Sequence, residues 1–340
     1  MAIRRMQVEN FTVFDQLKIE FSPGINVLIG ENATGKTHVL KLLYSACQAA
    51  KAKTTAVDFP QKIVKVFRPD DFNIGRLVRR KSGKGKSKVT VSSDIAEINI
   101  SFEGRTKRWE ADVTGSIGWE KQFSDLSSTF IPAKEILSNS HNLVQAIDKG
   151  NVDFDDTYKD LISAASIDVS SEQNDTQKTK YLSVLQNIIN GKVKFENEEF
   201  YLQSGNQSKL EFQLVAEGMR KIALLWQLIK NGSLENGAVL FWDEPEANIN
   251  PGHIPVLVDI LLDLQKDGVQ IFIATHDYMI AKYLELKQSG SNRVQFHSLY
   301  KSGDGIELES KKAFMDLEHN VIAKAYNQLL DEVFRDKTGV

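Results

Sequence analysis

The pattern of apolar residues over the first fifty positions predicts three short strands followed by a helix. Residues 3–9 and 17–21 carry clustered or alternating apolar side chains, and residues 25–29 predict a buried strand that ends at Gly30. From Lys36 onward, apolar residues recur every three or four positions, as they do on the buried face of a helix. The chain therefore opens with strands that lead into a β–α unit.

Regular alternation of helices and strands returns at residue 217 and continues almost to the end of the chain. Asn250 can cap the helix between two of these strands, with Pro251 at its first position and Gly268 just past its end. The elements predicted here are a helix over 217–230, strands over 239–242 and 269–274, a helix from Asp277, a strand near 294–300 and an amphipathic helix over 318–335. Both ends of the chain thus have an α/β pattern.

The segment between these blocks has two parts. The first, 62–127, predicts an antiparallel β subdomain, and the second, 133–215, predicts a mainly helical insertion followed by short strands. The expected pieces are strands at 87–93, 96–103 and 107–113, helices over most of 134–190, and strands at 192–203 and 208–213. Residues 216–340 would then join the N-terminal block in one discontinuous domain, 1–340.

Composition describes a globular chain with little excess charge. The 340 residues are 41% hydrophobic and 26% charged, and the net charge of −3 excludes a globally basic nucleic-acid coat. Cys47 is the single cysteine, which excludes a disulfide framework and a cysteine-based metal site. No apolar run approaches the roughly 20 residues that cross a bilayer, and no signal peptide is visible. We therefore expect a cytoplasmic protein with no membrane partner.

Residues 30–37 carry the clearest chemical signal. They match G-x-x-x-x-G-K-[ST], a pattern whose glycines let successive backbone N–H groups wrap a phosphate at the start of a helix. Lys36 can reach the β- and γ-phosphates of a nucleotide, and the Thr37 hydroxyl can ligate Mg²⁺. The loop lies between a predicted strand and a predicted helix, as the pattern requires. The residues expected at ATP are Gly30, Glu31, Asn32, Ala33, Thr34, Gly35, Lys36, Thr37 and His38.

A second group of residues follows the apolar run at 238–242. Asp243 and Glu244 come at the carboxyl end of this predicted strand, the edge at which open α/β sheets bind ligands. We expect Asp243 to hold Mg²⁺, directly or through water, and Glu244 to polarise the attacking water, with Glu246 as the next candidate. A solvated acidic turn is the alternative, and the phosphate-binding loop in the same chain argues against it.

Two further residues are candidates for the nucleotide site only because these two motifs are present. His276 follows the apolar strand that ends at Thr275 and could donate a hydrogen bond to the γ-phosphate, although a lone histidine is more often structural. Gly218 opens a predicted helix, and a glycine there permits a phosphate to approach the helix N-terminus. An ordinary helix start is the alternative for Gly218. The expected catalytic set is Lys36, Glu244 and His276.

The order of these motifs resembles the ABC-type ATPases of the SMC, RecF and OLD group, and among them compact bacterial ATPases of the AAA family. The residues that carry the resemblance are Val8–Phe11, Phe21–Asn32, Ala216–Lys221 and Phe241–Pro251, within about 1–50 and 128–300. It implies an ABC-type P-loop fold with a mostly parallel central sheet, ATP and Mg²⁺ as ligands, and head-to-tail pairing of two heads. ATP would lie between the phosphate loop of one subunit and the Gly218 region of the other.

Some features depart from the family pattern. The signature, usually Leu-Ser-Gly-Gly, is replaced by residues 215–218, Val-Ala-Glu-Gly, and lacks the serine hydroxyl. No glutamine follows the strand that ends at Pro132, where Glu135 is the candidate substitute. Residues 50–216 contain no long heptad runs, and few residues follow His276 compared with an added domain of about 100. We expect an ATPase head without coiled-coil arms or a Toprim nuclease domain.

A basic cluster lies between positions 76 and 88, where glycines interrupt it as in a loop between strands. Such a loop could grip the phosphate backbone of DNA through counterion release. A solvated hairpin is the competing interpretation, since no aromatic residues are interleaved to stack on bases. The cluster consists of Arg76, Arg79, Arg80, Lys81, Lys84, Lys86 and Lys88.

Three functions fit these observations. The first is a Mg²⁺-dependent ATPase, a homodimer or higher homo-oligomer, whose pairing controls DNA or an effector in DNA maintenance or antiphage defence. The second is a slow nucleotide-gated scaffold that holds a toxin or nuclease encoded nearby and makes no DNA contact, although the intact Glu244 argues against a dead ATPase. The third, a transporter motor, is disfavoured by the long insertion and the atypical signature. We adopt the first.

Overall fold

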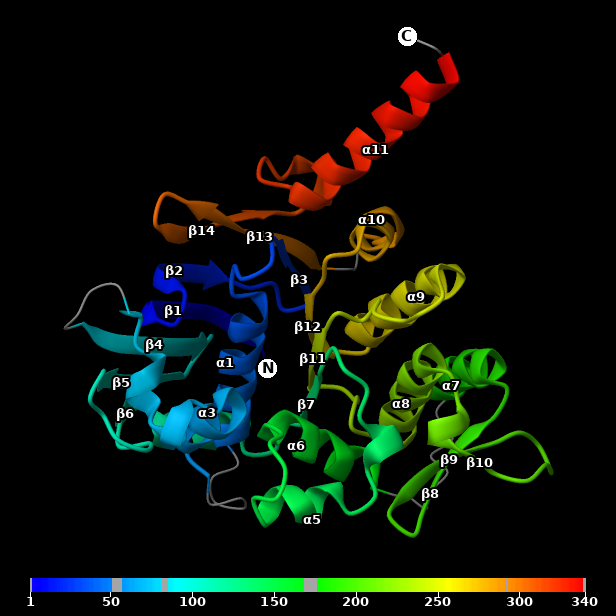
Figure 1. Cartoon of the computed structure of the whole chain (residues 1–340), viewed down its shortest axis with the longest axis horizontal. Helices are drawn as coiled ribbons and strands as arrows, with labels where there is room; N and C mark the ends of the chain where they lie inside the picture. The colour runs from blue at the N-terminus through cyan, green and yellow to red at the C-terminus, as the bar shows by residue number, and fades with distance from the viewer. Residues whose placement is uncertain (1, 51–56, 81–84, 168–175, 291–292, 339–340) are drawn as a thin grey trace.

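The chain is organised around two sheets that face each other across one helix. A computed structural model describes residues 2–50, 57–80, 85–167, 176–290 and 293–338. The central, six-stranded sheet has the order β14-β13-β3-β12-β11-β7, and all its strands are parallel except the edge strand β14 (Figure 1). Its strands are β3 (Ile25–Gly30), β7 (Ser128–Ile131), β11 (Val239–Asp243), β12 (Gln270–Ala274), β13 (Val294–Ser302) and β14 (Gly305–Lys311).

Successive residues of the central strands enter opposite hydrophobic layers. Val27 and Ile29 pack into one layer, whereas Leu28 between them packs into the other. Strands that are buried on both faces need apolar residues at nearly every position, which explains the continuous apolar runs in the sequence. One face is covered by α8 (Glu217–Lys230), α9 (Ile254–Lys266) and α10 (Tyr278–Lys287).

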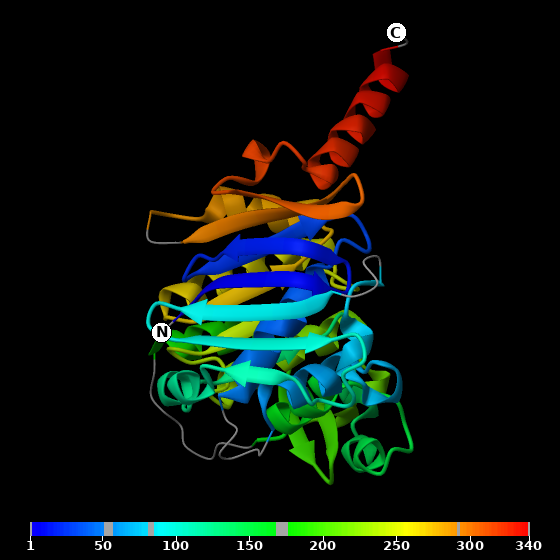
Figure 2. The same ribbon diagram turned by 90° about the vertical axis from the view of Figure 1, so that its left-hand side faces the viewer.

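Helix α1 (Lys36–Ala49) packs on the other face and separates it from a five-stranded antiparallel sheet, β2-β1-β4-β5-β6 (Figure 2). Residues 62–127 do not form this layer alone, because β1 pairs with β4 and brings β2 with it. The strands are β1 (Ile3–Phe11), β2 (Phe14–Glu20), β4 (Lys86–Ser93), β5 (Glu97–Glu103) and β6 (Asp112–Thr114). Two helices that the sequence pattern did not predict, α3 (Phe59–Phe67) and α4 (Ser116–Phe123), pack on α1 and β5.

The insertion between β7 and α8 contains three helices and a hairpin among its described residues. It contains α5 (Leu143–Asp148), α6 (Asp156–Ala165) and α7 (Thr176–Ile189), followed by the hairpin β8 (Lys192–Glu196) and β9 (Glu199–Gln203). The strand expected at 208–213 is wrong in part: β10 is only Leu210–Glu211, and Phe212–Leu214 form a 3₁₀ turn that buries Phe212. Most of 107–113 is likewise irregular, because Arg108 adopts a left-handed conformation with φ 45°.

The C-terminal part contains the helices predicted for it and one additional strand. Asn250 accepts a hydrogen bond from the Gly252 N–H, but this first turn is 3₁₀ and α9 itself begins at Ile254. Asp277 caps α10, and the unexpected β14 forms a hairpin with β13. Helix α11 (Val321–Thr338) projects away from the two sheets (Figure 2). Within the described ranges, no helix is long and apolar enough to cross a membrane.

Candidate active site

The residues expected to carry chemistry follow three adjacent parallel strands. Strand β12 lies between β3 and β11, so the segments that follow these strands are neighbours at one edge of the sheet. The edge brings Lys36, Glu244 and His276 within electrostatic reach of each other. Burial lowers the pKa of His276 and the Lys36 ammonium lowers it further, whereas the Glu244 carboxylate opposes both. The catalytic set expected from the sequence is therefore gathered in one place.

The two glycines of the phosphate loop are required by its backbone. Gly30 has φ 141°, and a Cβ there would lie 2.1 Å from the carbonyl oxygen of Leu299. Gly35 has φ 93°, and a Cβ there would lie 2.4 Å from the ring of Phe14. Both positions combine a left-handed or extended-mirror conformation with no room for a side chain, which only glycine tolerates. The glycine spacing of the motif thus follows from the positive φ angles of the loop and from its close packing against Leu299 and Phe14.

The Lys36 side chain folds back against the loop. Its Nζ donates hydrogen bonds to the carbonyl oxygens of Gly30 and Glu31, each at 2.9 Å. Burial lowers the pKa of Lys36 to about 8, against the opposing pull of Asp243 and neighbouring carboxylates. At neutral pH the ammonium therefore remains charged, and it can neutralise a phosphate bound by the loop.

The remaining loop residues differ in exposure. Glu31, Asn32 and Ala33 form an exposed tip, whereas Thr34 is buried. His38 is half-buried, and its Nδ1 lies 2.9 Å from the Thr12 hydroxyl, so it joins α1 to the β1–β2 turn. Burial lowers the pKa of His38 to about 4, which leaves the ring neutral. This ring is engaged with Thr12, a contact that the sequence did not indicate.

The phosphate loop and the acidic strand end are in direct contact. The Thr37 hydroxyl donates a hydrogen bond to Asp243 Oδ2 at 2.9 Å. Burial raises the pKa of Asp243, and the hydrogen bond from Thr37 opposes that rise. A hydroxyl and a carboxylate side by side are the oxygen ligands that Mg²⁺ uses when phosphates and waters complete its shell. No cluster of three or more acidic, histidine or cysteine ligands occurs in the described parts of the chain.

Glu244 adopts a left-handed conformation, with φ 48°, directly after β11. Its N–H donates to the carbonyl of Ala274 at 2.8 Å, and its carbonyl accepts from Lys221 Nζ at 3.4 Å. Lys221 belongs to α8 and was missed as a site residue. The available signal was a lysine at the start of the apolar run of a buried helix.

Gly218 packs α8 against the loop that follows β11. A Cβ at Gly218 would lie 2.1 Å from the carbonyl oxygen of Asn248. The sequence interpretation explained this glycine by the approach of a phosphate, and the structure adds a steric requirement within the chain. Glu135 also reaches α8: its Oε2 lies 2.7 Å from Arg220 Nε, close enough for an ion pair although the N–H is not aligned as a hydrogen bond. Glu135 is thus tied to the first turn of α8.

The family model described as an AAA domain, putative AbiEii toxin, Type IV TA system, matches residues 25–281, which include all three strand ends. The chain belongs to this AAA-domain family. Among curated proteins, the DNA replication and repair protein RecF of Streptococcus suis is 34% identical over 109 residues, 30% of this chain and 29% of RecF. RecF of Limosilactobacillus fermentum is 31% identical over 106 residues, 30% of this chain and 26% of that protein. The matched part is under a third of these relatives.

Solved structures show the same fold at low identity. An SMC head bound to the C-winged helix domain of ScpA superposes with a TM-score of 0.60 at 11% identity, over 92% of this chain and 98% of that one. The SMC head domain from Thermotoga maritima superposes with a TM-score of 0.51 at 10% identity, over 92% of this chain and 99% of that one. The AAA domain described here therefore shares the fold of SMC heads.

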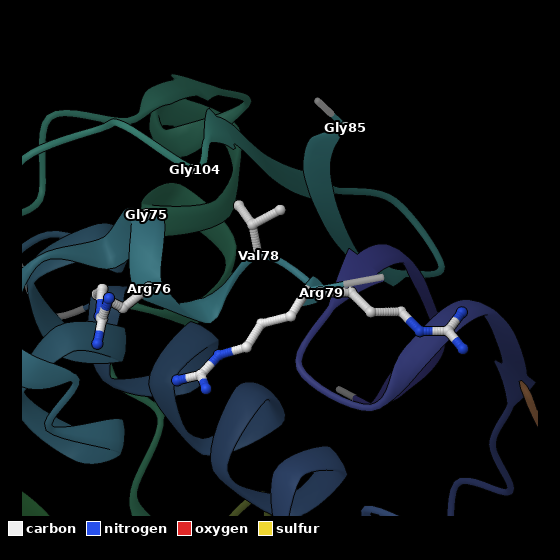
Figure 3. A pocket seen from close by; sticks show the side chains of 7 residues that line it. Gly75, Arg76, Val78, Arg79, Gly85 and Gly104 are labelled. Atoms are coloured by element: carbon white, nitrogen blue, oxygen red, sulfur yellow. The ribbon is translucent and has the colours of Figure 1, made fainter. Parts of the chain in front are cut away.

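Basic residues beside this AAA-domain site are engaged within the chain. Arg79 Nη1 lies 2.9 Å from Asp15, and the same side chain donates to the carbonyl of Asp304. Arg76 pairs with Asp70 at 3.4 Å, and Lys86 with Asp112 at 3.3 Å. A pocket of about 240 Å³ adjoins the cluster, and the side chains of Arg76 and Arg79 lie apart in it (Figure 3). Lys81 and Lys84 lie outside the described residues.

A larger cavity adjoins the phosphate loop. It has a volume of about 530 Å³ and touches Ala33 at the tip of the loop. The β1–β2 turn contributes Thr12 and Val13, and the β13–β14 turn and residues 76–80 close the other sides. Cavities of this size hold small ligands, and one that borders the loop has room for the nucleoside of a nucleotide whose phosphates lie on the loop.

Proposed function

We propose that this AAA-domain protein is a Mg²⁺-dependent ATPase whose ATP-bound heads pair head-to-tail. The observation that carries the proposal is the hydrogen bond of 2.9 Å between Thr37 and Asp243, which are 206 residues apart in the chain. A chance match to a phosphate loop would have no reason to meet an acidic strand end. Membership of the AAA-domain family and the fold shared with an SMC head support the same proposal.

Each residue of the edge has a role in this reaction. Lys36 neutralises the β- and γ-phosphates. Thr37 and Asp243 would hold Mg²⁺, whose positive charge would stabilise the negative charge of the phosphate oxygens. Glu244 accepts a proton from, or orients, the attacking water. Burial and Lys36 lower the pKa of His276 against the opposing effect of Glu244, which favours the neutral ring, and a neutral ring can donate one N–H to the γ-phosphate.

The pairing places the N-terminus of α8, with Gly218, at the nucleotide of a second copy. This arrangement would give a homodimer or a higher homo-oligomer. The SMC head that shares the fold was solved with a protein partner, and the family description names a toxin context. We therefore infer a cytoplasmic role in which ATP-dependent pairing controls a protein effector encoded nearby, in antiphage defence or DNA maintenance. The intrachain partners of Arg76, Arg79 and Lys86 favour a protein effector over DNA.

The variant Glu244→Gln tests the proposal, with Glu110→Gln at an exposed turn as the matched control. We expect Glu244→Gln to bind ATP, to lose about 100-fold or more in turnover, and to accumulate as an ATP-bound dimer. The measurements are phosphate release and light scattering with and without ATP. Lys36→Ala should abolish ATP binding in calorimetry, because it removes the charge that neutralises the phosphates. Wild-type turnover in Glu244→Gln, or ATP affinity unchanged in Lys36→Ala, would reject the assignment.

A further inference from the structure

We infer that Lys221 is a positioning residue that links the N-terminal part of α8 to the catalytic carboxylate Glu244. The inference rests on the proposed function and deepens it, since it makes the alignment of Glu244 depend on the place of α8. Four observations carry it: the burial of Lys221, the backbone of Glu244, the packing of α8 on the loop after β11, and an unpartnered oxygen of Glu246.

Lys221 is only 1% exposed. Among the residues that the structure describes, its ammonium makes one long hydrogen bond, 3.4 Å, to the carbonyl oxygen of Glu244. Burial lowers the pKa of Lys221, and surrounding carboxylates, Glu217 first and Glu246 next, raise it. A buried ammonium with so few partners is costly, so it stabilises the fold poorly compared with an apolar side chain of the same size. Because Lys221 lies beside Glu244, we infer that it holds the Glu244 backbone in place and does not serve mainly to stabilise the fold.

The conformation of Glu244 needs support. A glutamate at φ 48° lies in a region that few non-glycine residues adopt. Its peptide groups are held on both sides: the N–H by Ala274 at 2.8 Å, and the carbonyl by Lys221. The first bond anchors Glu244 to β12 and the second anchors it to α8. Together they set the direction in which the Glu244 side chain leaves the backbone.

The first turn of α8 contacts the same loop at a second point. Gly218 allows the carbonyl of Asn248 to approach so closely that a Cβ would lie 2.1 Å from it. A displacement of α8 is therefore passed to the loop that contains Glu244. In the proposed dimer this helix end meets the nucleotide of the other copy. Lys221 would then align Glu244 in one subunit when its own α8 engages the other.

Glu246 offers Lys221 a second partner. Its Oε1 is bonded to Thr275 and His276, but its Oε2 is buried without a hydrogen-bond partner among the described residues. An ammonium and a carboxylate oxygen that are both buried and under-bonded gain by approaching each other. A small shift of α8 toward the loop would therefore be stabilised by a Lys221–Glu246 contact, which joins α8 to the segment that carries His276.

The test is Lys221→Met, which keeps the volume of the side chain and removes the ammonium. Lys230→Met, at the other end of the same helix, is the matched control. We expect the ATP dissociation constant to stay within about twofold and kcat to fall about tenfold or more, whereas the control keeps both. A variant combining Lys221→Met with Glu244→Gln should still form the ATP-bound dimer.

The split between ATP affinity and kcat separates positioning from a structural role. Unchanged kcat in a folded Lys221→Met protein overturns the inference, as does a joint loss of ATP affinity, kcat and melting temperature. If this variant does not fold, Lys221→Gln decides by the same criterion. Failure of wild-type ATP turnover would reject the proposed function itself, whereas normal turnover in both Lys221 variants would reject only the role of Lys221.

Discussion

Glu246 reaches across from the loop after β11 to Thr275 at the end of β12, and its Oε1 accepts the threonine hydroxyl at 2.8 Å. The same oxygen accepts the backbone N–H of His276 at 3.0 Å. These two bonds fix the segment that carries His276 against the segment that carries Glu244. Glu246, the alternative base by sequence, thus has a structural task, which supports the role proposed for Glu244 at the attacking water.

Substitutions at Glu246 should therefore differ from those at Glu244. In Glu246→Gln an amide oxygen can still accept both hydrogen bonds, so we expect turnover to fall less than about tenfold. In Glu246→Ala both bonds are lost and His276 loses its anchor, so turnover should fall further. Steady-state phosphate release checks the order. If Glu246→Gln lost as much activity as Glu244→Gln, Glu246 would be the base.

Gly218→Ala should displace the first turn of α8. The added Cβ would meet the Asn248 carbonyl at 2.1 Å, and backbone on both sides resists the shift. We expect a loss of about 1–3 kcal/mol in the free energy of unfolding and a lower kcat. The control is Gly118→Ala in α4, where nothing lies within 4 Å and the alanine should stabilise the helix by about 0.5–1 kcal/mol. Equal urea midpoints for the two variants would contradict this packing.

Buried His297 should make the fold sensitive to mild acid. Its ring contacts Ser310 and Asn26, and burial lowers its pKa from 6.5 to about 3. The unfolded chain binds a proton below pH 6.5 but the folded chain does not until about pH 3. The neutral ring of His297 therefore leaves the free energy of unfolding unchanged above pH 6.5. Below pH 6.5 the free energy of unfolding falls by about 1.4 kcal/mol for each pH unit, because only the unfolded chain takes up the proton.

Urea unfolding of the wild type and of His297→Gln between pH 7 and 5 measures this slope. On acidification, the free energy of unfolding of the wild type should fall more steeply than that of His297→Gln, by about 1.4 kcal/mol per pH unit. Parallel pH profiles for wild type and His297→Gln would show that His297 does not stay neutral in the fold.

Arg79→Ala tests whether the basic cluster contacts DNA. Because its guanidinium is engaged with Asp15 and the Asp304 carbonyl, we expect the variant to lose stability and any DNA affinity to keep its salt dependence. An arginine bound to a phosphate would instead reduce the slope of log affinity against log salt by about 0.9. Duplex binding across a salt series, with and without ATP, decides between these outcomes.

Local sequence determined the phosphate loop, the apolar strands and the capped helices. Gly30 and Gly35 adopt positive φ angles, and Asp277 caps the helix that follows it, so these local roles are visible in a short pattern. The resemblance to a family also predicted the overall fold, because the order of motifs along the chain is characteristic of ATPase heads. The prediction of a short strand at 208–213 was wrong in part, because apolar alternation over so few residues also fits a 3₁₀ turn.

Only the tertiary structure decided which residues act together. The bond from Thr37 to Asp243, the bonds from Glu246 to Thr275 and the contact of Lys221 with Glu244 all join segments that different strands and helices bring together. The antiparallel layer also depends on pairing of β1 with β4, which lie far apart in the chain. Sequence patterns report the environment of a residue through its neighbours along the chain, whereas these contacts arise from strand order and helix packing, which bring distant segments to the same sheet edge.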